Sequence, residues 1–574
     1  MEYLVVVSIG PVQSFIGSAR KLEDFWSGSY LLSDITRRSI NIFKKHRWDN
    51  QCLIQPKLIK NLTVENFDMA ALPNRFLIKV ETTGNMVEQM KKIEAEIRHM
   101  VYLLLKNYVK KYFNHLSLEI EILLSKQIDE QLSDLLELYW AFIPYRPEQS
   151  FSQQREELEE NLASVKNIRQ ANYNVEYGLP CTMCGQRSAL TKKAIDNGSS
   201  YAEMKASLRE LWSTIDSESR KVSRNETLCA VCTAKRQQRA VLEDKLTSDG
   251  LKLTQTGFPS ISYFVNKSEA VRDAINKQNT YDIEFNKNDQ EVERYYAMIK
   301  FDGDNMGKWI AVADSLEEAS EKTERLTNFA QKGVIEAKKD KRLRVVYSGG
   351  DDVLAVGSVV DILRFTARIR ENFSDEHLGV GSDRTASAGI VIAPETYPLQ
   401  SVIQYANQAE GNAKEYKDFK GREKNAFSIL FIRRSGQQRQ IVLPFELEGS
   451  SSNLLSYILQ TATFWKQLSV SRSFIYHFQN AFQVLNDEYN REKISKQLAF
   501  YDKPELIESE FNRLIHNLSE LNDRTYITQL SKELTALYCK HQGNFLEFIH
   551  LLEIIFYISS NTDLANDKEV HDAL

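Results

Sequence analysis

The chain has 574 residues, of which 42 % are apolar and 26 % are charged, so it is long enough to form several globular domains. Its net charge is −5, from 73 basic and 78 acidic residues, which argues against a free-standing nucleic-acid binder with a broadly basic surface. No apolar run approaches the roughly 20 residues of a membrane-spanning helix, and the N-terminus lacks the basic flank and cleavage site of a signal peptide. We therefore expect a cytoplasmic protein without membrane contacts.

Residues 1–140 have the pattern of a first small α+β domain, which we interpret as an N-terminal palm-like unit. The apolar run 4–9 predicts an opening strand, and Gly10-Pro11 turns the chain into a helix that carries Phe15, Phe25 and Trp26. A second strand is predicted at 76–80. A long helix follows at 87–108, with apolar residues along one stripe.

Residues 141–285 predict a smaller α-helical, zinc-binding domain. Two Cys-x-x-Cys pairs, Cys181/Cys184 and Cys229/Cys232, flank a helical segment. Each pair can hold one metal from a short turn, and together they complete a tetrahedral four-cysteine zinc site. Redox-active thiols are the alternative, although nothing nearby resembles a thioredoxin unit. Because a closed shell of four sulfurs leaves no open coordination position, the expected role of the zinc is structural.

Residues 286–435 predict a second palm domain, and 436–574 predict a helical C-terminal domain. The second palm has a β-α-β-β-α-β pattern, the order of a ferredoxin-like fold. Its predicted strands are 295–301, 343–347, 353–356, 386–393 and 426–432. Its predicted helices are 316–338, another between the strands 353–356 and 386–393, and 399–416. The expected fold class is thus α+β, with two ferredoxin-like domains, an inserted zinc-binding domain and C-terminal helices.

The clearest indication of a catalytic site is a pair of turns that contain aspartates. Asp302 ends one predicted strand, and Asp351 and Asp352 lie in the hairpin between two others. A ferredoxin-like sheet makes the first strand and this hairpin neighbours, so the three carboxylates can converge. Clustered carboxylates suit Mg²⁺ or Mn²⁺, which can clamp a triphosphate and stabilise the leaving pyrophosphate. We therefore predict that Asp302, Asp351 and Asp352 are catalytic metal ligands.

Further residues are predicted to contact the nucleotide. Glycines 349 and 350 have no Cβ, so the backbone can approach a nucleotide closely, and Lys308 and Lys414 can hold phosphates. The predicted nucleotide-binding set is Ser348, Gly349, Gly350, Asp304, Lys308 and Lys414. One alternative is a purely structural exposed hairpin. A calcium loop of the EF-hand type fails, because Met306 and Ala313 occupy positions where ligands are required.

These motifs resemble a known family. The hairpin Ser348-Gly349-Gly350-Asp351-Asp352, with Asp302-Gly303-Asp304-Asn305-Met306-Gly307-Lys308 ahead of it, resembles the cyclase palm of the large subunit of type III CRISPR–Cas complexes. Other motifs match as well. Those that resemble the first palm of the Cmr (III-B) branch are Gly10-Pro11-Val12-Gln13-Ser14-Phe15-Ile16, Ala19-Arg20-Lys21, Asp24-Phe25-Trp26 and Leu72-Pro73-Asn74-Arg75-Phe76. Two more, later in the chain, are Ser387-Ala388-Gly389-Ile390 and Ala409-Glu410…Ala413-Lys414.

The resemblance implies an activity and partners. The second palm would bind ATP through Mg²⁺ and form phosphodiester bonds to give cyclic oligoadenylate, a second messenger in antiviral defence. Guide CRISPR RNA paired with target RNA would activate it, within a complex of other Cmr subunits. Many family members also carry an N-terminal HD nuclease domain. This chain starts at the palm strand, so no DNA cleavage is expected.

Three alternative functions stay open. The same palm could transfer AMP to a different small-molecule acceptor, because the motifs do not describe the acceptor pocket. The subunit could instead be a catalytically silent scaffold that binds RNA. A free diguanylate or adenylate cyclase shares the acidic hairpin, but the zinc domain and the first palm are unexpected there.

Overall fold

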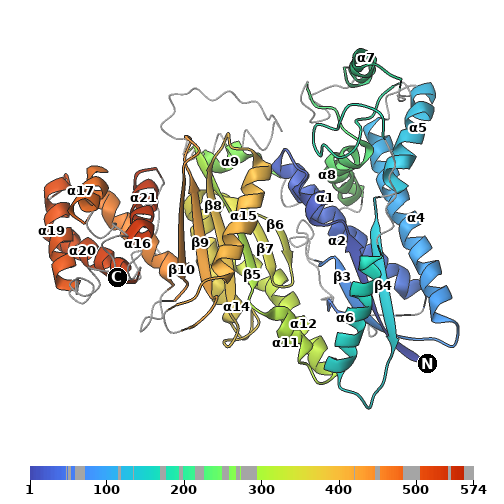
Figure 1. The fold of residues 1–574 in the computed structure, drawn as a ribbon, viewed down its shortest axis with the longest axis horizontal. Helices are drawn as coiled ribbons and strands as arrows, with labels where there is room; N and C mark the ends of the chain where they lie inside the picture. The colour runs from blue at the N-terminus through green and yellow to red at the C-terminus, as the bar shows by residue number, and fades with distance from the viewer. Residues whose placement is uncertain are drawn as a thin grey trace.

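The computed structural model describes residues 1–46, 48, 53–57, 72–113, 118–133, 135–168, 176–192, 198–213, 225–248, 258–266, 272, 294–418, 421–446, 453–482, 504–521, 523–540 and 545–561. Three parts lie along the long axis of the molecule: the N-terminal unit, a central sheet and the C-terminal helices (Figure 1). Within the ranges above, no helix is both long enough and apolar enough to span a bilayer.

The N-terminal sheet has four antiparallel strands in the order β2-β3-β1-β4. The strands are β1 (Glu2–Gly10), β2 (Leu53–Gln55), β3 (Arg75–Glu81) and β4 (Glu137–Pro144). The strands predicted at 4–9 and 76–80 are confirmed, whereas β2 and β4 were not predicted. The domain boundary expected at residue 140 falls inside β4, which pairs with β1 along its whole length and completes this sheet.

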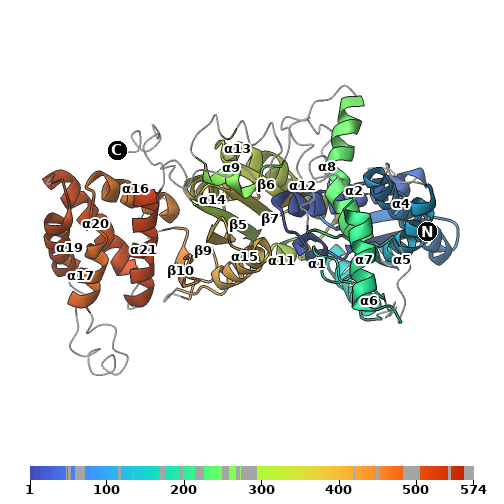
Figure 2. The same cartoon turned by 90° about the horizontal axis from the view of Figure 1, so that it is seen from above.

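Helices cover both faces of the N-terminal sheet. Those in this half of the chain are α1 (Gln13–Gly17), α2 (Leu22–Lys45), α4 (Met86–Tyr112), α5 (Leu118–Ser133), α6 (Phe151–Asn167), α7 (Tyr201–Trp212), α8 (Ala230–Ser248) and α9 (Ile261–Val265). One apolar core joins β1, β3, α2, α4 and the cysteine segments around 181 and 229. The predicted zinc-binding segment is therefore built onto the first sheet through a shared core. Seen from above, α7 and α8 lie beside α4 and α5 (Figure 2).

The central sheet has six strands in the order β10-β9-β8-β5-β7-β6. They are β5 (Tyr295–Gly303), β6 (Leu343–Gly349), β7 (Asp352–Gly357), β8 (Ala386–Pro394), β9 (Ala426–Ile432) and β10 (Gln438–Pro444). All pairs are antiparallel except β8–β9. The strands β8-β5-β7-β6 repeat the order β4-β1-β3-β2 of the first sheet. Five predicted strands are confirmed, and the edge strand β10 was not predicted.

The helices of this half pack on the central sheet and extend from it. They are α11 (Met306–Ala311), α12 (Leu316–Asn328), the π-helical turn η1 (Phe329–Gly333), α13 (Val334–Ala337), α14 (Val359–Ser374) and α15 (Leu399–Lys414), followed by α16 (Leu454–Gln467), α17 (Ser473–Ala481), α19 (Pro504–Leu518), α20 (Arg524–Lys540) and α21 (Phe545–Asn561). One continuous apolar core joins α14, β9, β10 and the C-terminal helices.

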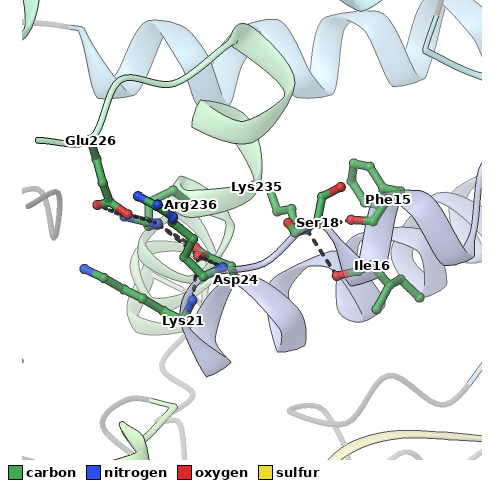
Figure 3. A network of polar contacts seen from close by, with 9 residues as sticks. Phe15, Ile16, Ser18, Lys21, Asp24, Glu226, Lys235 and Arg236 are labelled. Carbon is green, nitrogen blue, oxygen red and sulfur yellow. Dashed lines mark hydrogen bonds and ion pairs between the residues drawn. The ribbon is translucent and has the colours of Figure 1, made fainter. Parts of the chain in front are cut away.

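A buried polar network fastens the start of α2 to α8 (Figure 3). The Arg236 guanidinium donates to both carboxylate oxygens of Asp24, at 2.5 and 2.9 Å, and to Glu226 at 3.2 and 3.4 Å. The side chains of Asp24 and Arg236 have no solvent exposure. Burial alone would raise the pKa of Asp24, but the adjacent Arg236 cation lowers it below its ordinary value. The pair is therefore ionised in the interior.

The first half of α2 also packs against the central sheet. Leu22, Phe25 and Trp26 share one apolar cluster with Met298 of β5 and Leu354 of β7. Because the same stretch of α2 is held by Arg236, the buried ion pair fixes how the N-terminal unit meets the second sheet.

We expect Arg236→Met to destabilise the folded chain by about 3–5 kcal/mol, because it leaves Asp24 and Glu226 buried without a counter-ion. Thermal unfolding, followed by circular dichroism, measures the change. Arg513→Met is the matched control: it removes an exposed arginine paired with Glu510 on one helix, a type of pair worth only about 0–1 kcal/mol. Equal losses of stability in the two variants would contradict the role given to the buried pair.

Candidate functional site

The acidic hairpin lies at the end of β5. Strands β5 and β7 are neighbours, with Phe301 opposite Val353, so Asp302 at the end of β5 lies next to the β6–β7 turn. The turn is tight: Gly349 pairs with Asp352, and Gly350 between them has φ +71°, a left-handed conformation that favours glycine. The expected adjacency of the first strand and the hairpin is thus present.

Glycines allow the hairpin and the strand end to approach each other. A Cβ added at Gly303 would lie 2.9 Å from the Cβ of Asp351 and 2.9 Å from the Phe373 ring. A Cβ at Gly349 would clash with the Tyr347 hydroxyl. Both contacts are closer than non-bonded carbon atoms tolerate. Gly303 therefore allows the end of β5 to lie against the hairpin, and Gly349 leaves room for the Tyr347 side chain.

Two lysines and a glutamate surround Asp302. The Lys414 ammonium forms an ion pair with Asp302 and a second one, at 2.7 Å, with Glu410 one helical turn earlier on α15. Lys300 lies 3.8 Å from Glu410. The interaction with Asp302 and Glu410 raises the pKa of Lys414 above its ordinary value despite partial burial. Lys414 therefore stays charged and holds the Asp302 carboxylate.

The two hairpin aspartates form no ion pair with a described residue, although the charges of Lys300 and Lys414 partly offset the rise in their pKa values. Burial, with a further contribution from the neighbouring Asp302 charge, raises the pKa of Asp351 to about 8. Burial likewise raises the pKa of Asp352 to about 7. The Oδ1 atom of Asp352 is buried and has no hydrogen-bond partner among the described residues. A buried carboxylate without a partner is costly, and a bound cation removes that cost.

These observations decide whether the site fits a divalent cation. Among the described residues, the four cysteines are the one group of potential metal ligands whose ligand atoms all lie within 4.8 Å of one another. The oxygens of the three aspartates do not form such a group. Asp302 is instead held by Lys414. The donor set is nonetheless all carboxylate oxygen, as Mg²⁺ prefers, and includes the unpartnered Asp352 oxygen. The three aspartates therefore fit Mg²⁺ or Mn²⁺, with Lys414 as the cation that holds Asp302 here.

Two residues of the predicted nucleotide-binding set are engaged with the protein. The Asp304 carboxylate accepts hydrogen bonds from the Thr385 and Ser387 hydroxyls, both at 2.8 Å, and from the Asn425 backbone amide at 3.0 Å. The buried Ser348 hydroxyl donates to the Ala330 carbonyl at 2.7 Å. Both side chains thus hold the loops around the site in place. A nucleotide contact by either remains a prediction.

Lys308 and a residue that the sequence analysis did not select lie on the exposed side of the site. Lys308 is exposed on α11. Lys424 donates to the Asn305 side chain at 2.7 Å, and Lys424, Asn425 and Asn305 all have positive φ. Consecutive non-glycine residues in this conformation are strained, and strain of this kind accumulates at functional sites. No local sequence pattern marks Lys424, whereas Glu410 could have been found from its i, i+4 spacing to Lys414.

The four cysteines come together at the start of α8. All four sulfur atoms lie within 4.8 Å of one another, with Cys184 Sγ and Cys229 Sγ 3.9 Å apart. Cys181, Cys229 and Cys232 are buried, and Cys184 is partly exposed. Gly185, with φ +66°, closes the first knuckle by donating its amide to the Cys181 carbonyl at 2.9 Å. Hydrogen bonds from the other cysteines lower the pKa of Cys184. The cluster therefore fits a closed structural zinc site.

We expect one zinc ion per purified chain, held by this cluster. Elemental analysis should find about one zinc in the parent chain and much less in Cys181→Ser/Cys229→Ser, because a two-cysteine remnant binds zinc weakly. Cys539→Ser, a cysteine outside the cluster, is the control and should keep its zinc. Full retention of zinc in the double variant would exclude the cluster as the metal site.

We expect the affinity for Mg²⁺ to rise with pH, because Asp351 and Asp352, with pKa values near 8 and 7, must lose protons to bind a cation. Without Mg²⁺, the raised folded-state pKa values also mean that stability falls as pH increases from about 4 to about 8. Thermal unfolding across this range, with and without Mg²⁺, measures both effects.

Asp351→Asn/Asp352→Asn should flatten the pH dependence and abolish stabilisation by Mg²⁺. The exposed residue Asp383 provides the control Asp383→Asn, which should behave as the parent chain. The same Mg²⁺ stabilisation in the double variant would show that the cation binds elsewhere.

Two family models match the chain. The model described as Cas10/Cmr2, second palm domain, matches residues 295–427, and the model of the N-terminal region of the CRISPR-associated protein Cmr2 matches residues 4–110. They overlap β1, β2 and β3 of the first sheet and β5 to β8, with the start of β9, in the central sheet.

Two curated relatives extend the match. The chain is 23 % identical to the Cmr subunit Cmr2 of Pyrococcus furiosus over 83 % of this chain and 66 % of that protein. It is 36 % identical over 91 residues to the single-strand-specific deoxyribonuclease Cas10/Csm1 of Streptococcus thermophilus, which is 16 % of this chain and 11 % of the relative. The matched part thus spans less than two thirds of the length of either relative.

Two solved structures of the type III-B Cmr-beta complex share the fold. A chain of the apo complex matches with a TM-score of 0.62 and 14 % identity, over 90 % of this chain and 77 % of that one. A chain of the complex bound to cognate target RNA matches with a TM-score of 0.61 and 12 % identity, over 97 % and 83 %. The chain thus carries two segments that match the Cas10/Cmr2 second palm and the Cmr2 N-terminal region, it is similar over most of its length to the Pyrococcus furiosus Cmr2, and it shares its fold with chains of type III-B Cmr-beta complexes.

Proposed function

We propose that the domain around the central sheet is a metal-dependent nucleotidyltransferase that converts ATP into cyclic oligoadenylate. The observation that carries the proposal is the partly buried pair Asp351 and Asp352 on a glycine hairpin beside Asp302, with raised pKa values and with the Asp352 Oδ1 atom buried and without a hydrogen-bond partner among the described residues. A fold does not keep such a group for stability, because a buried unpaired carboxylate is destabilising. Perturbed carboxylates at the end of a strand are typical of catalytic sites.

The chain's own residues supply binding and orientation. Asp302, Asp351 and Asp352 would hold Mg²⁺ or Mn²⁺, which supplies neutralisation of triphosphate charge and activation of an attacking hydroxyl. Lys414, fixed between Asp302 and Glu410, keeps its charge at the edge of the acidic cluster and can contact a phosphate. Burial raises the pKa of Tyr347 well above its ordinary value, so its hydroxyl remains protonated beside the hairpin.

We further propose that the chain works inside a Cmr-type complex with guide CRISPR RNA, and that pairing with target RNA activates it. The support is the match to the two family models and the fold shared with a chain of the Cmr-beta complex bound to cognate target RNA. The repeated strand order of the two sheets supports two palm-like units of ferredoxin-like type. The first sheet lacks an acidic hairpin of the Gly-Gly-Asp-Asp type among its described residues, which favours a supporting role for it.

We expect Asp351→Ala/Asp352→Ala to abolish nucleotide product, by at least about 100-fold, because the metal would lose two of three carboxylates. The complex purified from its host, with labelled ATP, Mg²⁺ and target RNA, provides the assay. Asp383→Ala, an exposed aspartate of the same domain, is the control. Thermal unfolding must show that both variants are folded. Undiminished synthesis by the folded double variant would move the active site elsewhere.

Mass spectrometry of the products identifies the acceptor. Oligoadenylate formed from ATP alone supports the proposal. A product that appears only after addition of cell extract and contains a single AMP unit indicates a different small-molecule acceptor. Absence of pyrophosphate release under every condition indicates a silent RNA-binding scaffold.

A further inference from the structure

A cavity of about 260 Å³ lies in the N-terminal unit, between α2, α4 and α8. It is formed by residues remote in sequence from the acidic hairpin, and the nucleotidyltransferase mechanism uses none of them. Its walls are aliphatic and aromatic, from Leu104, Val241, Leu242, Tyr30 and Tyr108. The cavity therefore combines an apolar part with polar and charged side chains, and its volume is slightly below the range typical of small-molecule sites.

Charged groups gather at one side of this cavity. Among the described residues that line it, Arg37, Arg38 and Lys111 are basic and Asp34 is acidic. The Asp34 side chain is 3 % exposed and holds both guanidiniums, with Arg38 Nε donating at 2.7 Å. The arginines are thus oriented before any ligand arrives, and the basic side chains favour an anion.

Arg38 has hydrogen-bond donors that are not used within the described part of the chain. Its Nε is bound to Asp34, and its two terminal nitrogens make no hydrogen bond to any described residue. Its side chain is 35 % exposed, so these nitrogens can reach a ligand at the cavity mouth. A guanidinium held through Nε and presenting two terminal nitrogens matches the oxygens of a phosphate group.

The cavity also contains an unsatisfied acceptor. Gln238 on α8 is 2 % exposed, and its Oε1 atom has no hydrogen-bond partner within the described part of the chain. Its side chain is hydrogen-bonded to the Tyr108 hydroxyl, whose pKa is raised to about 12 by burial. A buried amide oxygen without a donor is costly. A ligand with an N–H group directed at Gln238 would satisfy it.

From these features we propose that this cavity is a binding site for a nucleoside monophosphate with an amino-bearing base, such as AMP. A phosphomonoester carries about −1.5 to −2 charges at neutral pH, which suits the basic side chains at the cavity. The phosphate binds Arg38 and its neighbours, the base lies against the tyrosines and aliphatic side chains, and its amino group donates to Gln238. The site is separate from the palm and goes beyond the proposed function.

The cavity lies near the buried ion pair that connects α2 to α8. Gln238 lies two residues after Arg236, which holds Asp24 at the start of α2, and Arg37 and Arg38 lie further along the same α2. A nucleotide that joins Arg38 to Gln238 therefore bridges the two helices that the buried ion pair already connects. Binding should stabilise the α2–α8 contact, and the midpoint of thermal unfolding should rise with nucleotide concentration.

The experiment is equilibrium dialysis of the full chain with radiolabelled AMP, without added Mg²⁺ and in the Asp351→Ala/Asp352→Ala background. The palm is disabled in that background, so the outcome is independent of the proposed nucleotidyltransferase. We expect saturable binding of one AMP per chain, and at least about tenfold weaker binding of adenosine and of inorganic phosphate.

Substitutions locate the site. Arg38→Ala should weaken AMP binding at least about tenfold, since it removes charged hydrogen bonds. Gln238→Leu should weaken AMP but leave ribose 5-phosphate unchanged, because only the base contacts Gln238. Lys110→Ala, on the same helix as Lys111 but outside the cavity, is the matched control and should bind as the parent does. Thermal unfolding confirms that each variant is folded.

Several results would overturn the proposal. Absence of saturable AMP binding at millimolar concentration would do so, as would binding of AMP that neither Arg38→Ala nor Gln238→Leu weakens. Equal affinity for adenosine and AMP would show that phosphate is not recognised. Binding of a 5′-phosphorylated RNA but not of AMP would show that the cavity takes an RNA end in place of a free nucleotide.

Discussion

The ion pair between Asp24 and Arg236 is the contact on which the arrangement of the two sheets depends. It joins the beginning of α2 to the second turn of α8, and Glu226 completes the charge balance. Beside it, the buried Lys235 ammonium donates to the backbone carbonyls of Phe15 and Ser18, at 2.6 and 2.5 Å. A buried cation that binds carbonyls requires those carbonyls at fixed positions, so the turn between β1 and α2 has little freedom. Since α2 also packs on the central sheet, this geometry carries over to the second domain.

The acidic site depends on a different constraint, which is the closeness of two backbones. Gly303 lacks the Cβ atom that would separate the end of β5 from the β6–β7 hairpin, so Asp302 and the hairpin aspartates lie at the same end of the sheet. Their mutual repulsion is relieved at Asp302 by Lys414, and at Asp351 and Asp352 by retention of protons. A divalent cation would have to displace these protons in order to bind Asp351 and Asp352.

Much of the central domain could be predicted from the sequence, because its strands are short apolar runs bounded by Gly, Pro and Asp. The hairpin was predictable for the same reason, since Gly350 in a left-handed conformation is what a tight turn demands. The strands β4 and β10 were missed. β4 ends at Pro144, which resembles a domain break, and β10 is an edge strand of mixed polarity, Gln438–Pro444. The pairing of Asp24 with Arg236 could not be predicted, because a single sequence does not show which distant charges meet.

Helix α8 connects the cysteine cluster with functional groups on its later turns. Its first turn carries Cys232, the next carries Lys235 and Arg236, and the following one carries Gln238. With a rise of 1.5 Å per residue, these groups lie within about 9 Å along the helix axis. A zinc ion held by four thiolates leaves a charge of about −2, and that charge lies close to Lys235, whose burial otherwise lowers its pKa. The cluster therefore favours the charged form of Lys235, and with it the carbonyl contacts that fix α2. The cysteine cluster, the ion pair and the cavity thus all involve successive turns of one helix, α8.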